Sequence, residues 1–145
     1  MKGKKGLIMG LANDRSLAWG IAQALGQQGA ELAFSYQGEA LEKRVRPLAQ
    51  ELGSDLLVDC DVSDMKALDK AFAGLKERWE SIDFVVHAIG FSDKNELRGK
   101  FVETTMDNFL LTMNISVYSF IAVAQRARAM MKPGGSLLTL TYYGA

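Results

Sequence analysis

The sequence predicts an α/β protein in which a parallel sheet lies between two layers of helices. Two observations carry this prediction. Short apolar runs of strand length alternate with helix-length segments along all 145 residues. Each run is nearly continuous rather than alternating with polar residues, as in strands that are covered on both faces. The elements follow in order.

The first strand is predicted over residues 6–10, and a glycine turn and a helix follow it. Apolar residues recur at i, i+4 and i+8 in that helix, namely Leu17, Ile21 and Leu25. Gly29 is a residue that commonly ends a helix, so the helix should stop near it. The second strand is predicted over residues 30–36.

A charged helix is predicted over residues 38–52, and Pro47 should kink or divide it. The third strand is predicted over 55–60. A helix capped by Ser63 or Asp61 should follow that strand. Its apolar face consists of Met65, Leu68, Phe72, Leu75 and Trp79.

The fourth strand is predicted over residues 82–89 and is closed by Gly90. A long helix should run from about 105 to 131, where the Pro-Gly-Gly sequence at 133–135 stops it. The fifth strand is predicted over 136–142. Because no repeat or linker interrupts this alternation, residues 1–145 should form one domain with a Rossmann-type, doubly wound parallel sheet in three α/β/α layers, of which the first five strands are present.

Composition narrows the possible functions. Seventeen basic and seventeen acidic residues cancel, so no nucleic acid or charged membrane partner is expected. No run of about 20 apolar residues suggests a membrane span, and the basic start lacks the apolar run of a signal peptide. One cysteine excludes an internal disulfide, and no cysteine–histidine cluster suggests a metal. The expected location is the cytoplasm.

Parallel sheets of this kind bind ligands beyond the carboxyl ends of their strands. Candidate residues follow all five predicted strands: Gly10 and Ser16; Tyr36 and Gln37; Asp61 and Val62; Ile89, Gly90 and Phe91; Tyr142 and Tyr143. The first turn reads Gly10-x5-Ser16-x3-Gly20, which is longer than the common dinucleotide pattern G-x-G-x-x-G. Gly10 and Gly20 are expected to serve ligand binding, although they could simply make a turn and a close contact between helix and strand.

Each polar candidate has a structural alternative. Ser16 is placed to bind a phosphate at a helix N-terminus, although it could simply cap that helix. Asp61 is placed to meet an adenine amino group, or to cap the following helix. Gln37 stands where NAD enzymes often carry an acidic residue and NADP enzymes an arginine, so it leaves the cofactor open. Lys43 and Arg44 could reach a 2′-phosphate if their helix is suitably oriented.

The cysteine and the histidine of this sequence, both of which could be reactive, are interpreted as packing residues. Cys60 and His87, the only histidine, both lie in predicted core strands. We therefore expect neither of them to be catalytic.

The chain resembles the NADH-dependent enoyl-[acyl-carrier-protein] reductases of bacterial fatty-acid synthesis, a divergent group of the short-chain dehydrogenase/reductase superfamily. The similar stretches are 10–22, 31–37, 60–62, 87–91, 115–120 and 137–145. Ordinary carbonyl reductases of the superfamily have Asn-Ala-Gly after the fourth strand and a serine at the end of the fifth. This chain has Ala88-Ile89-Gly90 and Tyr142 there, which favours enoyl over carbonyl reduction.

The resemblance implies a role for each candidate residue. The residues implied to line the NADH site are Gly10, Ser16, Leu17, Gln37, Asp61, Val62 and Ile89. Gly90 would let the backbone approach the cofactor, and Phe91 and Ser92 would border the acyl substrate. Tyr142 would lie close to the thioester oxygen, and no metal takes part. The family also implies an enoyl-acyl carrier protein substrate and a homotetramer.

The family's principal tyrosine donor and the lysine after it would fall beyond Ala145. We therefore expect residues 1–145 to be truncated before the C-terminal part of the domain, and to bind a dinucleotide weakly without turnover. The fifth strand would then be an uncovered edge. Two other readings stay open: another reductase of the superfamily acting on ketoacyl or other carbonyl groups, and a dinucleotide-binding module without catalysis.

Overall fold

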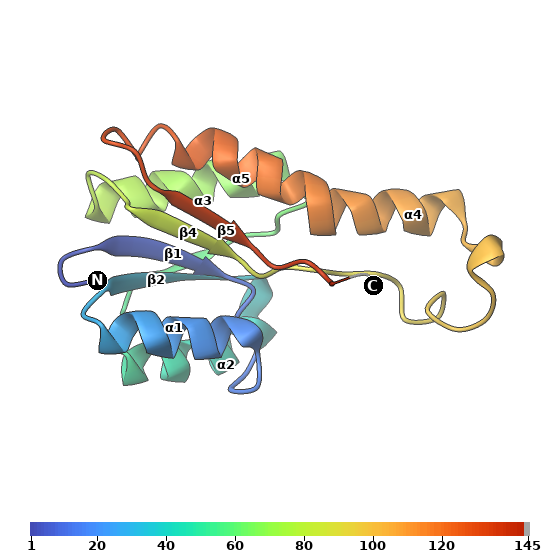
Figure 1. Ribbon diagram of the computed structural model, residues 1–145, viewed down its shortest axis with the longest axis horizontal. Coiled ribbons are helices and arrows are strands. Elements are labelled where there is room, and N and C mark those ends of the chain that lie inside the picture. Colours follow the sequence, from blue (N-terminus) through green and yellow to red (C-terminus); the bar gives the residue numbers. More distant parts are fainter. Residues whose placement is uncertain (144–145) are drawn as a thin grey trace.

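The computed structural model describes residues 1–143, and its centre is a five-stranded parallel sheet between two layers of helices (Figure 1). The strand order is β3-β2-β1-β4-β5. The strands are β1 (Lys5–Met9), β2 (Glu31–Tyr36), β3 (Leu57–Asp59), β4 (Phe84–His87) and β5 (Ser136–Thr139). The α/β Rossmann-type prediction is therefore confirmed.

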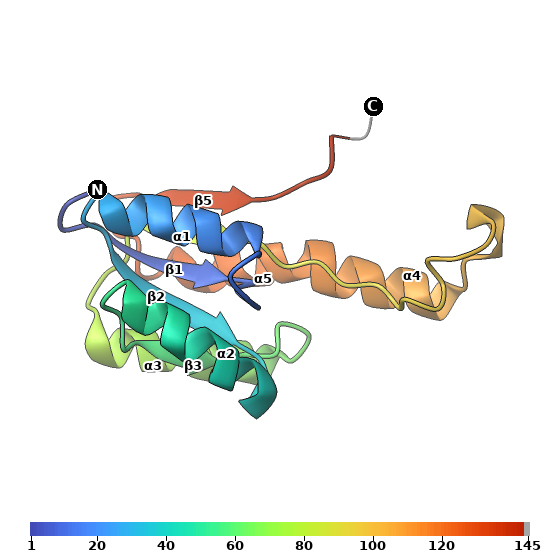
Figure 2. The same cartoon turned by 90° about the horizontal axis from the view of Figure 1, so that it is seen from below.

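The helices cover both faces of the sheet. They are α1 (Leu17–Gln27), α2 (Gly38–Glu51), α3 (Met65–Arg78), the 3₁₀ turn η1 (Phe101–Glu103), α4 (Met106–Met113), the π-helical turn η2 (Asn114–Tyr118) and α5 (Ser119–Ala127). Helices α1 and α2 lie on one face and α3 and α5 on the other, while α4 extends beyond the sheet (Figures 1 and 2).

The strands bury successive side chains on opposite faces. In β1, Leu7 and Met9 belong to the core beneath α3 and α5, whereas Ile8 belongs to the core beneath α1 and α2. In β4, Val85 and Val86 divide in the same way. Two-sided burial is the reason why these strands read as continuous apolar runs.

The chain reverses its direction of travel across the sheet at β1. It moves outward through β2 to β3, then crosses back to β4 and β5 on the other side of β1. The segments that leave the carboxyl ends of β1 and β4 therefore diverge, and a crevice opens between them. This switch point is where such sheets bind ligands.

The strands are shorter than predicted. The third covers Leu57–Asp59 rather than 55–60, the fourth Phe84–His87 rather than 82–89, and the fifth Ser136–Thr139 rather than 136–142. A strand extends only as far as its backbone pairs with that of a neighbouring strand, and this pairing sets the limits. β3, for example, pairs with β2 only through Phe34 to Tyr36. Apolar residues outside the ladder still continue the sequence pattern, so the pattern overestimates strand length.

Two helical details also differ from the predictions. Pro47 lies inside α2 without dividing it, because Pro47 is on the exposed side of a helix whose Val45 and Ala49 are buried. The cap of α3 is Asp64, whose carboxylate accepts a hydrogen bond from the Lys66 N–H at 2.8 Å. The predicted caps, Ser63 and Asp61, lie one and three residues before the observed cap.

The predicted helix over 105–131 is continuous over residues 106–127 and contains the π-helical turn η2 in its middle. This 22-residue helix has a mean hydropathy of 1.2 in its most apolar window, and 22% of that window is buried. By length and composition it could cross a membrane, contrary to the expectation from the sequence.

Candidate functional site

A pocket of about 320 Å³ lies at the carboxyl ends of β1 to β4. Residues from four separate connections meet in its wall. The predicted residues found there are Gly10, Tyr36, Gln37, Asp61, Val62, Ile89, Gly90 and Phe91. The volume is within the range of small-molecule sites, which is roughly 300–1,000 Å³.

Gly10 brings the ends of β1 and β4 together. Its φ of +94° is in the left-handed region, and a Cβ built there would lie 2.5 Å from the Ala88 carbonyl carbon and closer still to its oxygen. Only glycine fits this position. Gly20 is not part of the pocket wall, and it does not make the alternative close contact either, since a Cβ there would have none of the described atoms within 4 Å.

The N-terminus of α1 is open to an anion. Ser16 occupies the cap position, but its hydroxyl does not cap the helix. The Ser16 Oγ instead accepts hydrogen bonds from the Ala12 and Asn13 N–H groups, at 3.1 and 3.0 Å. The first turn of α1 contains no acidic residue. The Trp19 N–H donates to the Ser16 carbonyl at 2.9 Å, so the Leu17 and Ala18 N–H groups are the first-turn amides that remain for a phosphate. The favourable end of the helix dipole is not neutralised.

Acidic and amide groups meet at the ends of β2 and β3. The Gln37 Nε2 donates a hydrogen bond to Asp61 at 2.8 Å, and Asp61 also accepts from the Ser63 N–H at 2.9 Å. Beside them, the Gly38 N–H donates to Asp59 at 3.0 Å. Carboxylate oxygens accept hydrogen bonds from hydroxyl and amino groups and repel phosphates. This end of the pocket therefore suits ribose and adenine better than a 2′-phosphate.

The two basic residues proposed for a 2′-phosphate do not line this pocket. Lys43 borders a separate hollow along α2, together with Glu39 and Glu42. Arg44 is exposed and is absent from both pocket walls. The condition that their helix be suitably oriented is not met, so neither side chain supports NADPH over NADH.

Sequence reasoning missed several residues of the pocket wall. These are Leu11, Ala12, Ser35, Leu41, Ser63 and Ile115, together with Cys60, which was assigned to packing alone. Most of them adjoin a predicted strand end, so extending each strand-end motif by one or two residues would have found them. Ile115 comes from the π-helical turn η2 and lies in the stretch 115–120 that resembles the family, but no role was assigned to it.

Cys60 is both a packing residue and part of the pocket wall. It is 5% exposed, and burial raises the pKa of its thiol to about 12, with smaller contributions from Asp61 and Asp59. The thiol is therefore protonated at neutral pH, and the reactive species is the thiolate.

We expect iodoacetamide to alkylate Cys60 at pH 8 on the order of a thousandfold more slowly in the folded protein than in urea. Mass spectrometry measures this rate without ambiguity because the chain has one cysteine. Native labelling at the unfolded rate would show that the thiol is not shielded.

His87 is buried at the end of β4, as its assignment to the core predicts. Its Nε2 lies 2.7 Å from the Ser119 Oγ, and that hydroxyl donates to the Ile115 carbonyl at 2.6 Å. The Ser119 oxygen must then accept the Nε2 proton, which leaves Nδ1 as an acceptor for Thr139 at 3.5 Å. Burial lowers the pKa of His87, so the ring is neutral at pH 7.

This lowered pKa gives a pH dependence with a defined sign. As pH falls through the ordinary histidine value of 6.5, the unfolded chain takes up a proton that the folded protein does not. We therefore expect the free energy of unfolding to decrease from pH 7 to pH 5.5. Urea titrations measure it, and in His87→Gln, which does not titrate, the decrease should be smaller. An equal slope in both proteins would contradict this assignment.

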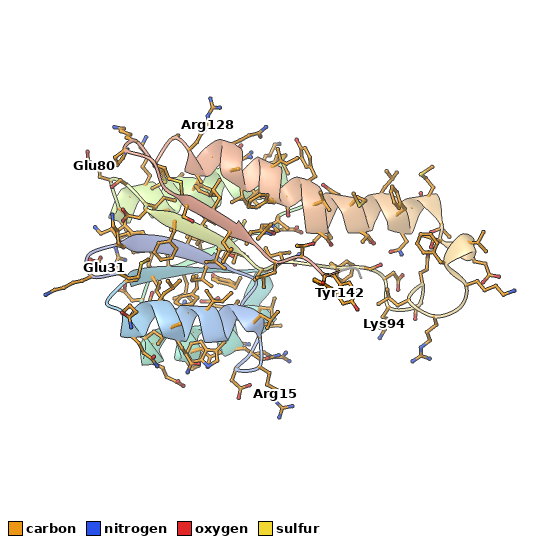
Figure 3. All side chains as sticks on the ribbon, in the orientation of Figure 1. Arg15, Glu31, Glu80, Lys94, Arg128 and Tyr142 are labelled. Atoms are coloured by element: carbon orange, nitrogen blue, oxygen red, sulfur yellow. The ribbon has the colours of Figure 1, made fainter. Side chains whose placement is uncertain are left out.

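The residues predicted for the substrate side are separated in the structure. Phe91 lies in the pocket wall and is 52% exposed. Ser92 is outside the wall and is hydrogen-bonded to Asn108 and Thr112 instead. Tyr142 is 91% exposed and lies beyond the carboxyl end of β5, while Arg15 projects from the loop before α1 (Figure 3).

Ser16 and Leu17, which were predicted for the cofactor site, also lie outside the pocket wall, and Leu17 is 72% exposed.

Comparison with known proteins agrees with this geometry. The family described as enoyl-(acyl carrier protein) reductase matches residues 10–145. Enoyl-[acyl-carrier-protein] reductase [NADH] 1 of Rhizobium meliloti is 61% identical over the whole chain. A crystal structure of FabI from Candidatus Liberibacter asiaticus matches 99% of the chain with a TM-score of 0.97 and 55% identity. The reductase of Anaplasma phagocytophilum, solved in complex with NAD, matches with a TM-score of 0.96 and 58% identity.

The chain spans about half the length of these relatives. It covers 53% of the Rhizobium protein and 55% of each of the two crystallised chains.

Proposed function

The chain belongs to the enoyl-(acyl carrier protein) reductase family, and from this we propose that it forms the NADH-binding part of a cytoplasmic enzyme of bacterial fatty-acid synthesis. The enzyme would reduce the trans-2 double bond of enoyl-acyl carrier protein. The observation that carries the proposal is the pocket at the switch point, where Gly10, Asp61 and Ile89 meet from three different strands. When bound, the dihydronicotinamide supplies a hydride to the β-carbon of the enoyl thioester.

The residues fit a dinucleotide along its length. Gly10 leaves room for the pyrophosphate beside the backbone, and the uncapped N-terminus of α1 supplies N–H groups to it. Where the adenosine would lie, the Asp61 carboxylate accepts hydrogen bonds and the Gln37 amide supplies both a donor and an acceptor. Together these residues orient the cofactor and favour NADH over NADPH.

The reacting end is apolar. Ile89, Phe91 and Ile115 line this part of the pocket and keep water from the reacting carbon, while Gly90 lets the backbone approach the nicotinamide. Reduction places negative charge on the thioester oxygen, and a hydrogen-bond donor stabilises it. Tyr142 would contribute its hydroxyl near that oxygen, and Ser92 would border the acyl chain.

The reaction is tested by NADH oxidation in a protein that contains these residues, with crotonyl and acetoacetyl thioesters as competing substrates. We expect reduction of the crotonyl double bond and little reduction of the acetoacetyl carbonyl. Preference for the acetoacetyl thioester would favour a carbonyl reductase of the superfamily. NADH binding without turnover of either thioester would favour a dinucleotide-binding module without catalysis.

We also propose that this enzyme is a homotetramer. The long helix over 106–127 leaves large apolar side chains exposed, among them Phe109, Leu110, Met113 and Ile121. At the sheet edge, Leu137 and Leu138 of β5 are exposed as well. Exposed large apolar side chains in this number are typical of an interface. A second copy covering these surfaces explains the apolar helix without a membrane.

We expect sedimentation at micromolar concentration to give an assembly larger than a monomer, and Leu110→Lys to shift it toward smaller species. Sedimentation of the wild-type protein as a monomer, or its partitioning into lipid vesicles, would contradict this proposal.

A further inference from the structure

One face of the helix over 106–127 carries a row of polar side chains, which we call the polar stripe: Asn108, Thr112, Ser116 and Ser119. Spacings of four, four and three residues place them on one side of a helix. We infer that the polar stripe is a positioning device, which fixes residues 90–93 and thereby the shape of the pocket at its reacting end. This inference rests on the proposed function, because it names the residues that hold the cofactor pocket in shape.

Ser116 makes the most direct contact with the pocket wall. Its Oγ accepts a hydrogen bond from the Phe91 N–H at 3.0 Å and lies 3.2 Å from the Phe91 carbonyl oxygen, to which it donates. One hydroxyl thus satisfies both backbone polar groups of a residue that lines the pocket. The phenyl ring of Phe91 is half exposed, so core packing alone does not fix this segment.

The two residues after Phe91, which lie outside the pocket wall, are also held by side chains of the polar stripe. The Asn108 Oδ1 accepts from the Asp93 N–H at 3.0 Å, and its Nδ2 donates to the Ser92 Oγ at 3.1 Å. The Thr112 hydroxyl lies 2.9 Å from the same serine oxygen. Asn108 is 8% exposed, and a buried amide with its hydrogen bonds made defines one arrangement of its partners.

At its other end the polar stripe is anchored in the core. Ser119 is fully buried and accepts the hydrogen bond from His87, the last residue of β4. The stripe therefore follows the chain from the end of β4 to Asp93. Each of its four members contacts a residue between His87 and Asp93.

The helix is π-helical where it meets the pocket. The turn over residues 114–118 supplies both Ile115, a wall residue, and Ser116, which holds Phe91. Single π-helical turns inside α-helices occur frequently at functional sites. Here the wider turn lets adjacent residues serve the pocket wall and the polar stripe.

The test removes single hydroxyls and measures cofactor affinity together with backbone protection. In Ser116→Ala we expect the NADH dissociation constant to rise roughly 5- to 30-fold, the equivalent of one or two hydrogen bonds. Amide hydrogen exchange at Phe91 should become faster. The thermal midpoint should change little, because alanine is the better helix former. Ser116→Thr retains the hydroxyl and should restore both affinity and protection.

Two further variants complete the experiment. Thr112→Val removes the next hydroxyl without changing side-chain size, and it should raise the NADH dissociation constant in the same direction even if Ser116→Ala folds poorly. Ser81→Ala is the matched control, since Ser81 is exposed in the turn before β4, at the end of the strand opposite the pocket. Ser81→Ala should leave both the NADH dissociation constant and the rate of amide hydrogen exchange at Phe91 unchanged.

The possible outcomes separate the two proposals. If the wild-type protein binds NADH and Ser116→Ala binds it equally well, or exchange at Phe91 is unaltered, the positioning role is wrong and the proposed function stands. If the wild-type protein does not bind NADH, the proposed function is wrong and the positioning role is lost with it. A fall in the thermal midpoint with unchanged affinity would show a purely structural role and overturn the inference.

Discussion

A Gly10→Ala substitution is expected to lower the free energy of unfolding by about 3 kcal/mol or more, and to abolish measurable NADH binding. The added Cβ would overlap the Ala88 carbonyl group, so β1 and β4 would have to separate at their carboxyl ends. The positive φ of Gly10 adds strain for any other residue. Urea denaturation measures the stability, and calorimetric titration measures the binding.

Two other glycines separate the causes of this effect. Gly53 has a similar φ of +72°, but a Cβ there would have none of the described atoms within 4 Å. Gly53→Ala should therefore cost only the strain, roughly 1–3 kcal/mol. Gly20→Ala should be neutral or stabilise α1 by up to about 1 kcal/mol. If Gly10→Ala is as stable as Gly53→Ala, the contact with Ala88 does not explain the glycine.

An Asp61→Ala substitution is expected to raise the NADH dissociation constant about 10- to 100-fold, the effect of losing a hydrogen bond to a charged group. The carboxylate lies in the pocket wall and also holds the Gln37 side chain in place. NADPH should lose less affinity than NADH, because the same change removes a negative charge from the site of a 2′-phosphate. Fluorescence titrations with NADH and NADPH measure, for each cofactor, the ratio of the variant's dissociation constant to that of the wild-type protein.

Asp55→Ala is the matched control for this prediction. Asp55 is 80% exposed, pairs with Arg78 at 3.0 Å, and lies just before β3, away from the pocket. Its removal should leave both dissociation constants unchanged. Equal NADH affinity in Asp61→Ala and the wild-type protein would exclude Asp61 from the cofactor site.

The arrangement of the sheet follows from the sequence because two-sided burial leaves continuous apolar runs such as 84–87. The strand limits do not follow from it, since they depend on which residues find a partner in the neighbouring strand. Leu56 and Cys60, for example, are buried and each makes one backbone hydrogen bond to β2, yet both lie outside the paired residues of β3. The helix over 106–127 shows another limit of sequence reasoning. The apolar periodicity predicts a helix there, but it indicates neither the π-helical turn nor how little of the helix is buried.

The pocket was predictable where its residues follow a strand directly, as Gly10, Gln37 and Ile89 do. Ile115 follows no strand, because it reaches the pocket from a helix that is distant in sequence, and only the resemblance over 115–120 included it. Ser16 was assigned correctly to the start of a helix. Its hydroxyl oxygen, however, can accept hydrogen bonds either from the helix or from the loop before it. It holds the preceding loop rather than the first turn of α1.

The central claim is that NADH binds across the carboxyl ends of the strands, between the N-terminus of α1 and the exit of β4. Titrating NADH into ¹⁵N-labelled protein and following the amide resonances tests it most directly. The predicted result is saturable shifts at Gly10, the first turn of α1, Gln37, Asp61 and Ile89. Shifts confined to the separate hollow along α2, or no shifts at millimolar NADH, would contradict it.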